Sequence, residues 1–480
     1  MKKVLMFITA ICLSGTVLSA QETSLRLTAP ARVISKKAPA KADSTGMAIP
    51  DDSPSVDVAT TKPKSLVDIQ HDSLAASHKI IYIDGKPLSN NTQQHLDSIR
   101  TLIDNFYYDQ FRHFQDPAAP YFLFMSKDAS LAMGIGGCVR MRGWYEWGGV
   151  VPINGFSPYF IPMTPSPARM KRFGTTPSGS TLFFRVIGRN KTLGNYQLYI
   201  EANFNGYQGV DFHLKKAYAT INNWTIGYAS STFSDPSALP PTVDASGPNN
   251  KISPTSVLVR WMKPIAKLWT VAASLETPST QPALTDSVTE KVDDWLPDAA
   301  AFIQYEWGRS EHVRLAGILR TLPYRDLVAG RNHNILGWGL QLSTVLHPAP
   351  AWTIYANVCG GKGYESLGGD LQMGNYDLIA RPGHEGELYA PAAMGFNVAA
   401  QYNFRPNLFA SVTYSQTRFM PKHDVASSEY KFGQYVAANV FWNLTPRIQV
   451  GAEFNIGMRQ NFDGAHRWAR RVGAMAQFSF

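Results

Sequence analysis

The chain has 480 residues and is basic, with 45 lysines and arginines, 36 acidic residues and a formal net charge of +9. Only 17% of the residues are charged and 12% are aromatic. Its 3 cysteines are too few for a disulfide framework and lack zinc-finger spacing. A basic balance alone is compatible with nucleic acid, an acidic lipid surface or a pathway for anions.

Residues 1–20 have the form of a secretory signal peptide. Lys2 and Lys3 precede an apolar run from Val4 to Leu13, and a small-residue site ends at Ala20. This run is shorter than the roughly 20 residues of a membrane-spanning helix, and no later stretch is long enough. The sequence therefore predicts export, which excludes intracellular nucleic acid as a partner.

Residues 21–118 are predicted to form a periplasmic extension. Up to about residue 65 the chain is rich in Ala, Pro, Ser, Thr and Lys, and we expect a disordered tether there because too little apolar surface offsets chain entropy. Residues 80–83 form a short extended stretch. From Asn91, a stripe running from Leu96 to Phe106 predicts one amphipathic helix. The helix either mediates oligomerisation or packs against the periplasmic end of the following domain.

Residues 119–480 are predicted to form the main domain. Segments of about ten residues alternate apolar with small or polar side chains, as in transmembrane β-strands. The sixteen segments are 131–147, 181–188, 196–203, 211–221, 224–231, 255–262, 267–276, 299–309, 312–321, 334–347, 352–359, 393–404, 408–418, 430–443, 448–459 and 467–480. The fold class that they indicate is all-β, a 16-stranded antiparallel transmembrane β-barrel.

The connections between these segments alternate between long and short. The longest are 148–180, 232–254 and 360–392, whereas 222–223 and 310–311 have only two residues each. Outer-membrane barrels have long extracellular loops and short periplasmic turns, so this alternation favours a barrel over a sandwich or propeller.

The tryptophans and the last strand support the same fold. The tryptophans beside short connections are Trp224, Trp261, Trp269, Trp307, Trp352 and Trp442, and those beside long ones are Trp144, Trp147, Trp295 and Trp468. Two such groups are typical of the aromatic girdles of a membrane barrel. The alternating final strand ends in Phe480 and resembles the signal that barrel-assembly machinery recognises.

The two-residue period of a strand predicts which charged residues face the lumen. Arg or Lys facing lipid at mid-bilayer would cost roughly 2–4 kcal/mol. The predicted basic pore-lining residues are Arg140, Arg142, Arg185, Lys215, Arg260, His312, Arg314 and Arg320. Glu201, Glu276, Glu306 and Glu453 are predicted to face inward as well. Either the bases attract anions, or the acids balance them.

The connection after the fifth strand contains four prolines between residues 236 and 248 and two acidic residues, Asp235 and Asp244. In trimeric porins the third extracellular loop folds into the barrel. We expect this loop to do so and to place its acids opposite a basic wall at a constriction. The alternative is a solvent-exposed outer loop.

Two stretches, Leu214 through Tyr218 and Gly227 through Asp244 with Gly247-Pro248, resemble the DcaP-like family of trimeric outer-membrane porins. The resemblance spans residues 131–480. It implies a homotrimer, a helical periplasmic extension and uptake of small anionic solutes such as dicarboxylates, with Lys215 as a basic lumen residue. Lys216 stands where the family more usually has His, and the stripe in the extension is shorter than a coiled coil.

The sequence thus predicts an outer-membrane porin of a Gram-negative bacterium for small hydrophilic, anionic solutes. The expected partners are outer-membrane lipid, two further copies of the chain, the barrel-assembly machinery and small polar solutes, without nucleic acid. We expect no catalytic residues, metal or cofactor, because no Ser, His and acid converge and His384 to Glu387 lacks zinc-site spacing. The alternative is a plugged structural or adhesin barrel that binds partners through its long loops.

Overall fold

The computed structural model describes residues 79–82, 122–125 and 131–480, except residues 191, 193, 206–209, 286 and 309. The predicted signal peptide, the tether and the helix of residues 91–106 lie outside the described residues. Residues 80–82 of the predicted stretch 80–83 belong to strand β1, Lys79–Tyr82, and residue 83 lies outside the described residues.

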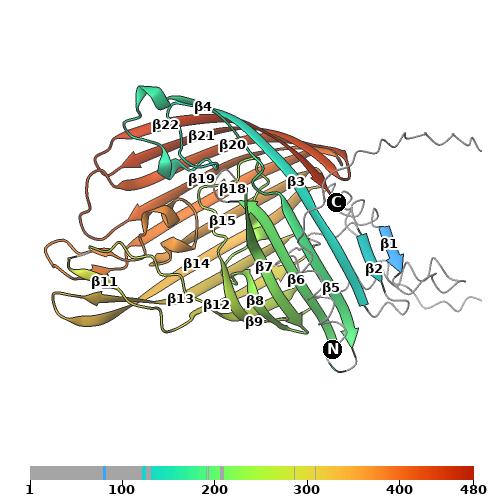
Figure 1. The fold of residues 1–480 in the computed structure, drawn as a ribbon, viewed down its shortest axis with the longest axis horizontal. Helices are drawn as coiled ribbons and strands as arrows, with labels where there is room; N and C mark the ends of the chain where they lie inside the picture. Colours follow the sequence, from blue (N-terminus) through green and yellow to red (C-terminus); the bar gives the residue numbers. More distant parts are fainter. Residues whose placement is uncertain are drawn as a thin grey trace, which may run out of the picture. The chain divides into compact units, whose positions relative to one another are not determined.

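A closed antiparallel barrel of 16 strands follows, as the sequence predicts (Figure 1). Its first eight strands are β3 (Leu131–Trp147), β5 (Thr181–Asn190), β6 (Gly194–Asn205), β7 (Asp211–Ile221), β8 (Trp224–Ser230), β9 (Thr255–Ala266), β10 (Trp269–Glu276) and β12 (Asp298–Glu306). The others are β13 (His312–Asp326), β14 (Arg331–Ala349), β15 (Trp352–Lys362), β18 (Ala392–Arg405), β19 (Leu408–Met420), β20 (Tyr430–Thr445), β21 (Ile448–Asn461) and β22 (His466–Ser479).

Strands β22 and β3 lie side by side and close the barrel (Figure 1). Their register runs from the pair Arg470 and Trp147 to the pair Ser479 and Cys138. The bounds of β3 and β7 are those predicted, whereas β13 and β14 extend further and leave only residues 327–330 between them. Pro323 and Tyr324 interrupt the alternation on which the prediction depends, but the ladder continues through them.

Strand β2 (Phe122–Met125) extends the sheet at this seam. The first residues of β3 run past the end of β22, and β2 pairs with them from Ala132 to Ile135. Strand β1 pairs with β2 in parallel. Strand β2 therefore covers a part of the β3 edge that β22 leaves open.

Apolar side chains cover the outer surface of the barrel. Val139, Met141, Leu315 and Leu319 are 55%, 50%, 49% and 56% exposed, and they alternate with inward residues. An exposed band of this kind marks a surface in contact with lipid rather than water. No helix among the described residues is long and apolar enough to cross a membrane.

Most of the predicted girdle tryptophans point outward, but Trp144 does not. Trp224, Trp269, Trp352, Trp442 and Trp468 are 40–51% exposed, whereas Trp144 is 6% exposed. Its place in β3 puts it on the inward face, where Arg471 and Arg172 lie over its ring at 5.0 and 5.8 Å. The prediction that Trp144 belongs to a girdle was wrong, because it used connection length without the alternation of β3.

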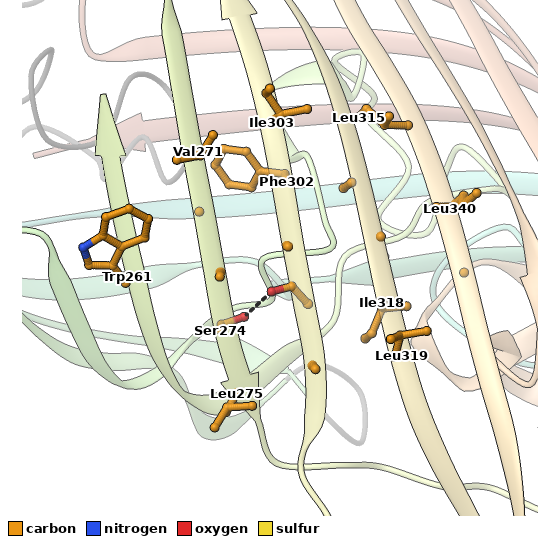
Figure 2. A pocket seen from close by; sticks show the side chains of 18 of the residues that line it. Trp261, Val271, Ser274, Leu275, Phe302, Ile303, Leu315, Ile318, Leu319 and Leu340 are labelled. Carbon is orange, nitrogen blue, oxygen red and sulfur yellow. Dashed lines mark hydrogen bonds between the residues drawn. The ribbon is translucent and has the colours of Figure 1, made fainter. Parts of the chain in front are cut away.

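A shallow apolar depression lies on the outer wall, with a volume of about 1120 Å³ (Figure 2). Small residues form its floor, since Ala273, Ala301 and Gly317 are opposite one another on β10, β12 and β13. Larger side chains such as Leu315 and Leu340 surround it. The depression faces lipid and is no part of the lumen.

Three long loops fold against the inner wall: L1 (148–180), L3 (231–254) and L6 (363–391). In L1, the fully buried Phe156 and Ile161 pack with Tyr435 of β20. Phe233 of L3 and Leu371 of L6 belong to another buried cluster. L4 (277–297) and L6 contain the short strands β11 (Thr289–Lys291), β16 (Ile379–Ala380) and β17 (Leu388–Tyr389), and L1 contains β4 (Lys171–Thr176).

Candidate functional site

Loop L3 crosses the inner wall and is bound to it at successive strands. At its beginning, the Thr232 backbone N–H donates a hydrogen bond of 2.8 Å to Glu276 on β10. Ser256 and Ser274 donate to the same carboxylate at 3.3 and 2.7 Å. Glu276, predicted to face the lumen, faces inward but is 3% exposed and holds the start of L3.

Asp235 fixes the next part of L3 to β13 and β14. Its Oδ2 lies 2.9 Å from His312 Nε2 and accepts a 2.5 Å hydrogen bond from Ser343, and its Oδ1 lies 3.3 Å from Arg314 Nη1. Burial alone would raise the pKa of Asp235, but Arg314 and His312 more than offset it and hold the pKa well below its usual range. Asp235 is therefore an ionised anchor that contacts the Arg314 guanidinium and the His312 ring.

Asp244 and Glu453 hold the second half of L3. Glu453 on β21 accepts hydrogen bonds from the backbone N–H groups of Val243 and Asp244 at 2.8 and 2.9 Å. Asp244 Oδ1 accepts a hydrogen bond of 2.8 Å from the Phe156 backbone N–H of L1. Both acids of L3 are in direct contact with other protein groups, so neither faces a basic wall across open lumen.

Several predicted basic residues face inward but are covered. Arg185, Arg260, Arg314 and Arg320 are at most 1% exposed. The Arg185 guanidinium lies 5.4 Å from the Tyr199 ring centre, and Arg260 donates to the Ser230 carbonyl at 3.2 Å. The alternation of each strand identifies the inward face but carries no information on what covers it.

Arg320 joins the wall to two extracellular loops. Its Nε lies 3.0 Å from Asp298 and its Nη1 lies 3.2 Å from Asp377 of L6. It also donates to the Gly363 and Ser279 carbonyls at 2.9 and 3.0 Å. Glu306, at the opposite end of β12 from Asp298, is half-buried and accepts a hydrogen bond of 3.2 Å from Gln304.

Arg140, Arg142 and Lys215 are the predicted bases that stay accessible. Arg140 donates to Gln477 at 2.7 Å and Arg142 to the Ser178 carbonyl at 2.9 Å, and both are half-buried on β3. A Cβ at Gly179 would lie 3.2 Å from Arg140 Nη1 and 3.3 Å from Arg142 Nη1, so the two guanidinium groups lie close together.

Lys215 lies on β7, which is separated from β3 by β5 and β6. Its side chain is 43% exposed, and its Nζ lies 2.6 Å from Glu201 Oε1 on β6. The register of β6 and β7 shifts between Glu201 and Ala202, so β7 has an extra residue here. The shift explains how Lys215 faces Glu201 although Lys216 is opposite Glu201 in the ladder.

Lys251 of L3 is a fourth cation at this place, and the sequence analysis missed it. It is half-buried, and its Nζ donates to the Ala245 carbonyl at 3.4 Å. Burial lowers the pKa of Lys251; Asp244 opposes this shift, whereas the charges of Lys215, Arg142 and Arg140 add to it. A loop has no two-residue period, so no pattern could have indicated where Lys251 points. We call Arg140, Arg142, Lys215 and Lys251 the basic cluster.

The chain is similar in fold to solved outer-membrane channels. The DcaP channel of Acinetobacter baumannii matches with a TM-score of 0.64 and 20% identity, over 74% of this chain and 99% of that chain. An anion-selective porin from Comamonas acidovorans matches with a TM-score of 0.49 and 10% identity, over 73% of this chain and 100% of that chain. No family model and no curated protein sequence matches the chain. The DcaP match confirms the predicted resemblance at the level of the fold, a sixteen-stranded porin barrel.

Proposed function

We propose that the protein is an outer-membrane porin for small hydrophilic solutes, with a preference for anions at a constriction between L3 and the wall of β3, β6 and β7. The observation that carries the proposal is the accessible surface of the basic cluster: Arg140 and Arg142 meet beside Gly179, Lys215 is 43% exposed, and L3 adds Lys251. The dicarboxylate-like solutes implied by the sequence resemblance fit this charge.

The charge balance of the accessible groups supports the anion preference. The carboxylates of Asp235, Asp244, Glu276 and Glu453 are at most 8% exposed and bound to protein donors. Asp235 is paired with Arg314 at 3.3 Å, and the field of such an ion pair falls off faster than that of a single charge. The basic cluster has Glu201 as the acid in direct contact with one of its members, and its remaining positive charge attracts anions.

We extend the proposal to export, membrane insertion and assembly. Residues 1–20 direct export, the final strand engages the barrel-assembly machinery, and three copies form a homotrimer. The sequence resemblance supports the trimer, and the apolar outer band supports the membrane location.

Reversal potentials in planar bilayers under a KCl gradient test the ion preference. We expect the wild type to favour chloride and the variant R140Q/R142Q/K251Q to lose most of that preference. Arg418→Gln is a matched control, because Arg418 is exposed on the outer face of β19 beside Phe432. Equal reversal potentials in the wild type and the triple variant would contradict the proposal.

A specific observation favours the second candidate, a plugged barrel. L1, L3 and L6 all place buried apolar side chains inside the barrel, including Phe156, Phe233 and Leu371. A plugged barrel would insert into bilayers without stepwise conductance, whereas a porin would give discrete steps. The same recordings therefore separate the two functions.

A further inference from the structure

The segment of L3 that carries Lys251 is bound to the wall through the two residues before Lys251. The Lys251 N–H donates to the Pro248 carbonyl at 3.0 Å, which closes a turn. Asn250 N–H donates to Ser415 Oγ at 3.2 Å, and Thr417 Oγ1 donates to the Asn249 carbonyl at 3.0 Å. Asn249 Nδ2 also donates to the Gly433 carbonyl of β20 at 3.1 Å. The turn thus meets β19 and β20 through its two asparagines, while the Lys251 side chain belongs to the basic cluster.

Loop L6 holds the same turn from the other side. The Asp370 N–H donates to the Asn249 carbonyl at 2.9 Å, and Asn249 Nδ2 donates back to Asp370 Oδ2 at 3.0 Å. Ile252 and Gly368 form a β-bridge one residue beyond Lys251. L6 therefore binds L3 on both sides of Lys251.

The Asp370 carboxylate also binds L1 and the wall. Ser157 Oγ of L1 donates to Oδ1 at 2.6 Å, and Tyr430 OH of β20 donates to Oδ2 at 3.0 Å. Asp370, Asn249, Ser157 and Tyr430 are all at most 5% exposed. One buried carboxylate thus connects L1, L3, L6 and the barrel.

Two glycines beside Asp370 let the backbones of L6 and L3 touch. Gly368 and Gly369 have φ of 152° and 68°, values that favour glycine. A Cβ on Gly369 would lie 2.6 Å from the Asn249 carbonyl oxygen, and one on Gly368 would overlap the Lys251 carbonyl oxygen. This close approach is an independent sign that L6 determines the path of residues 249–252.

We propose that Asp370 is a positioning residue for the constriction: through Asn249 it holds Lys251 in the basic cluster, so that extracellular loop L6 sets the ion preference of the channel. The proposal rests on the proposed function, because it needs Lys251 to act on permeating ions. Asp370 itself is buried and touches no solute.

The test compares reversal potentials of the full-length wild type, D370A, K251Q and the double variant D370A/K251Q. D370A removes one of the two acceptors of Asn249 Nδ2, the other being the Gly433 carbonyl of β20, so we expect a shift in the same direction as that of K251Q but smaller. If Asp370 acts through Lys251, the double variant gives the same potential as K251Q alone. Additive shifts would overturn the proposal.

Asp377→Asn is the matched control in the same loop. Asp377 is also fully buried, but it binds Arg320, the Ser366 N–H and the Gln281 N–H rather than L3. We expect D377N to keep the wild-type potential. Heat-modifiability on gels reports whether each barrel has folded, which separates positioning from a general loss of structure.

The outcomes distinguish this inference from the proposed function. If K251Q and the triple variant of the basic cluster leave the potential unchanged, the proposed function fails. If they shift it and folded D370A does not, the positioning role of Asp370 is wrong and the proposed function stands. If D370A does not fold, Asn249→Ala decides: it removes the amide that donates to Asp370 and to the Gly433 carbonyl, and it should shift the potential in the same direction. No shift in this variant would refute the role of Asp370.

Discussion

At the scale of single residues, the inner wall uses its charges in two ways. Asp235, His312 and Arg314 are at most 1% exposed and satisfy one another, whereas Arg140, Arg142, Lys215 and Lys251 keep accessible surface. The first group binds a loop to the barrel, and the second is available to solutes. Charges of one strand face can therefore serve opposite purposes, depending on what covers them.

Replacing Asp235 should loosen L3 and destabilise the protein. In D235A the partners His312 and Arg314 remain buried without their carboxylate, and breaking a buried pair on one side costs about 3–5 kcal/mol. We expect a lower urea midpoint in detergent and a noisier open channel. Equal midpoints for D235A and the wild type would contradict the anchoring role.

Sequence alone identified the inward charged residues but not their surroundings. Arg140 and Arg314 both stand in strands that alternate apolar and polar residues. The sequences of β3 and β13 do not indicate that, of these two arginines, L3 covers Arg314. Lys251 was missed for the complementary reason, since its orientation depends on contacts between residues of L3 and L6 that are distant in the sequence.

At the scale of elements, the junction of L1, L3 and L6 should respond to pH. Burial raises the pKa of Asp370 to about 6, although hydrogen bonds from Ser157, Asn249 and Tyr430 oppose the shift. In a released loop the pKa of Asp370 would be near 4, so the carboxylate binds its proton more tightly in the packed junction. The packed junction is then most stable below about pH 4, and its stabilisation falls by up to about 3 kcal/mol as the pH rises through 6.

The expected readout is current noise between pH 5 and pH 8. Loop fluctuations should increase toward pH 8 in the wild type, because the ionised carboxylate is the less favourable buried form. D370N cannot titrate at this position and should give noise that hardly changes with pH. A wild-type trace with the same noise at both ends of this range would exclude Asp370 as the titrating group.

Strands and loops differ in how far the sequence determines them. The bounds of β3 and β7 follow from alternation, which the pleat imposes on every residue of a wall between lipid and lumen. The inward packing of L1 and L6 does not follow, because Phe156 and Leu371 stand in segments without a period. The four residues of β2 are likewise too few for a pattern to identify them as a strand.

At the scale of the whole molecule, β2 joins strand β1 to the barrel seam. The variant L123P/F124P removes two consecutive backbone N–H donors, and in a regular strand one of the two points toward β3. Each lost hydrogen bond should lower the free energy of unfolding by about 1 kcal/mol. We expect faster proteolysis before residue 131 and a lower temperature for loss of the folded band. L123A/F124A keeps the backbone donors and should behave much more like the wild type; equal sensitivity of both variants would argue against the pairing.

The pairing of β22 with β3 has a consequence for the order of folding. Glu146 and Arg471 are 325 positions apart along the chain, yet their side chains meet at 2.7 Å. Until the last strand arrives, the growing sheet has two unsatisfied edges that could join another chain, and contacts between such distant positions form slowly. Refolding into micelles should therefore end in a slow step, the joining of the first and last strands, while the hairpins between them have already formed.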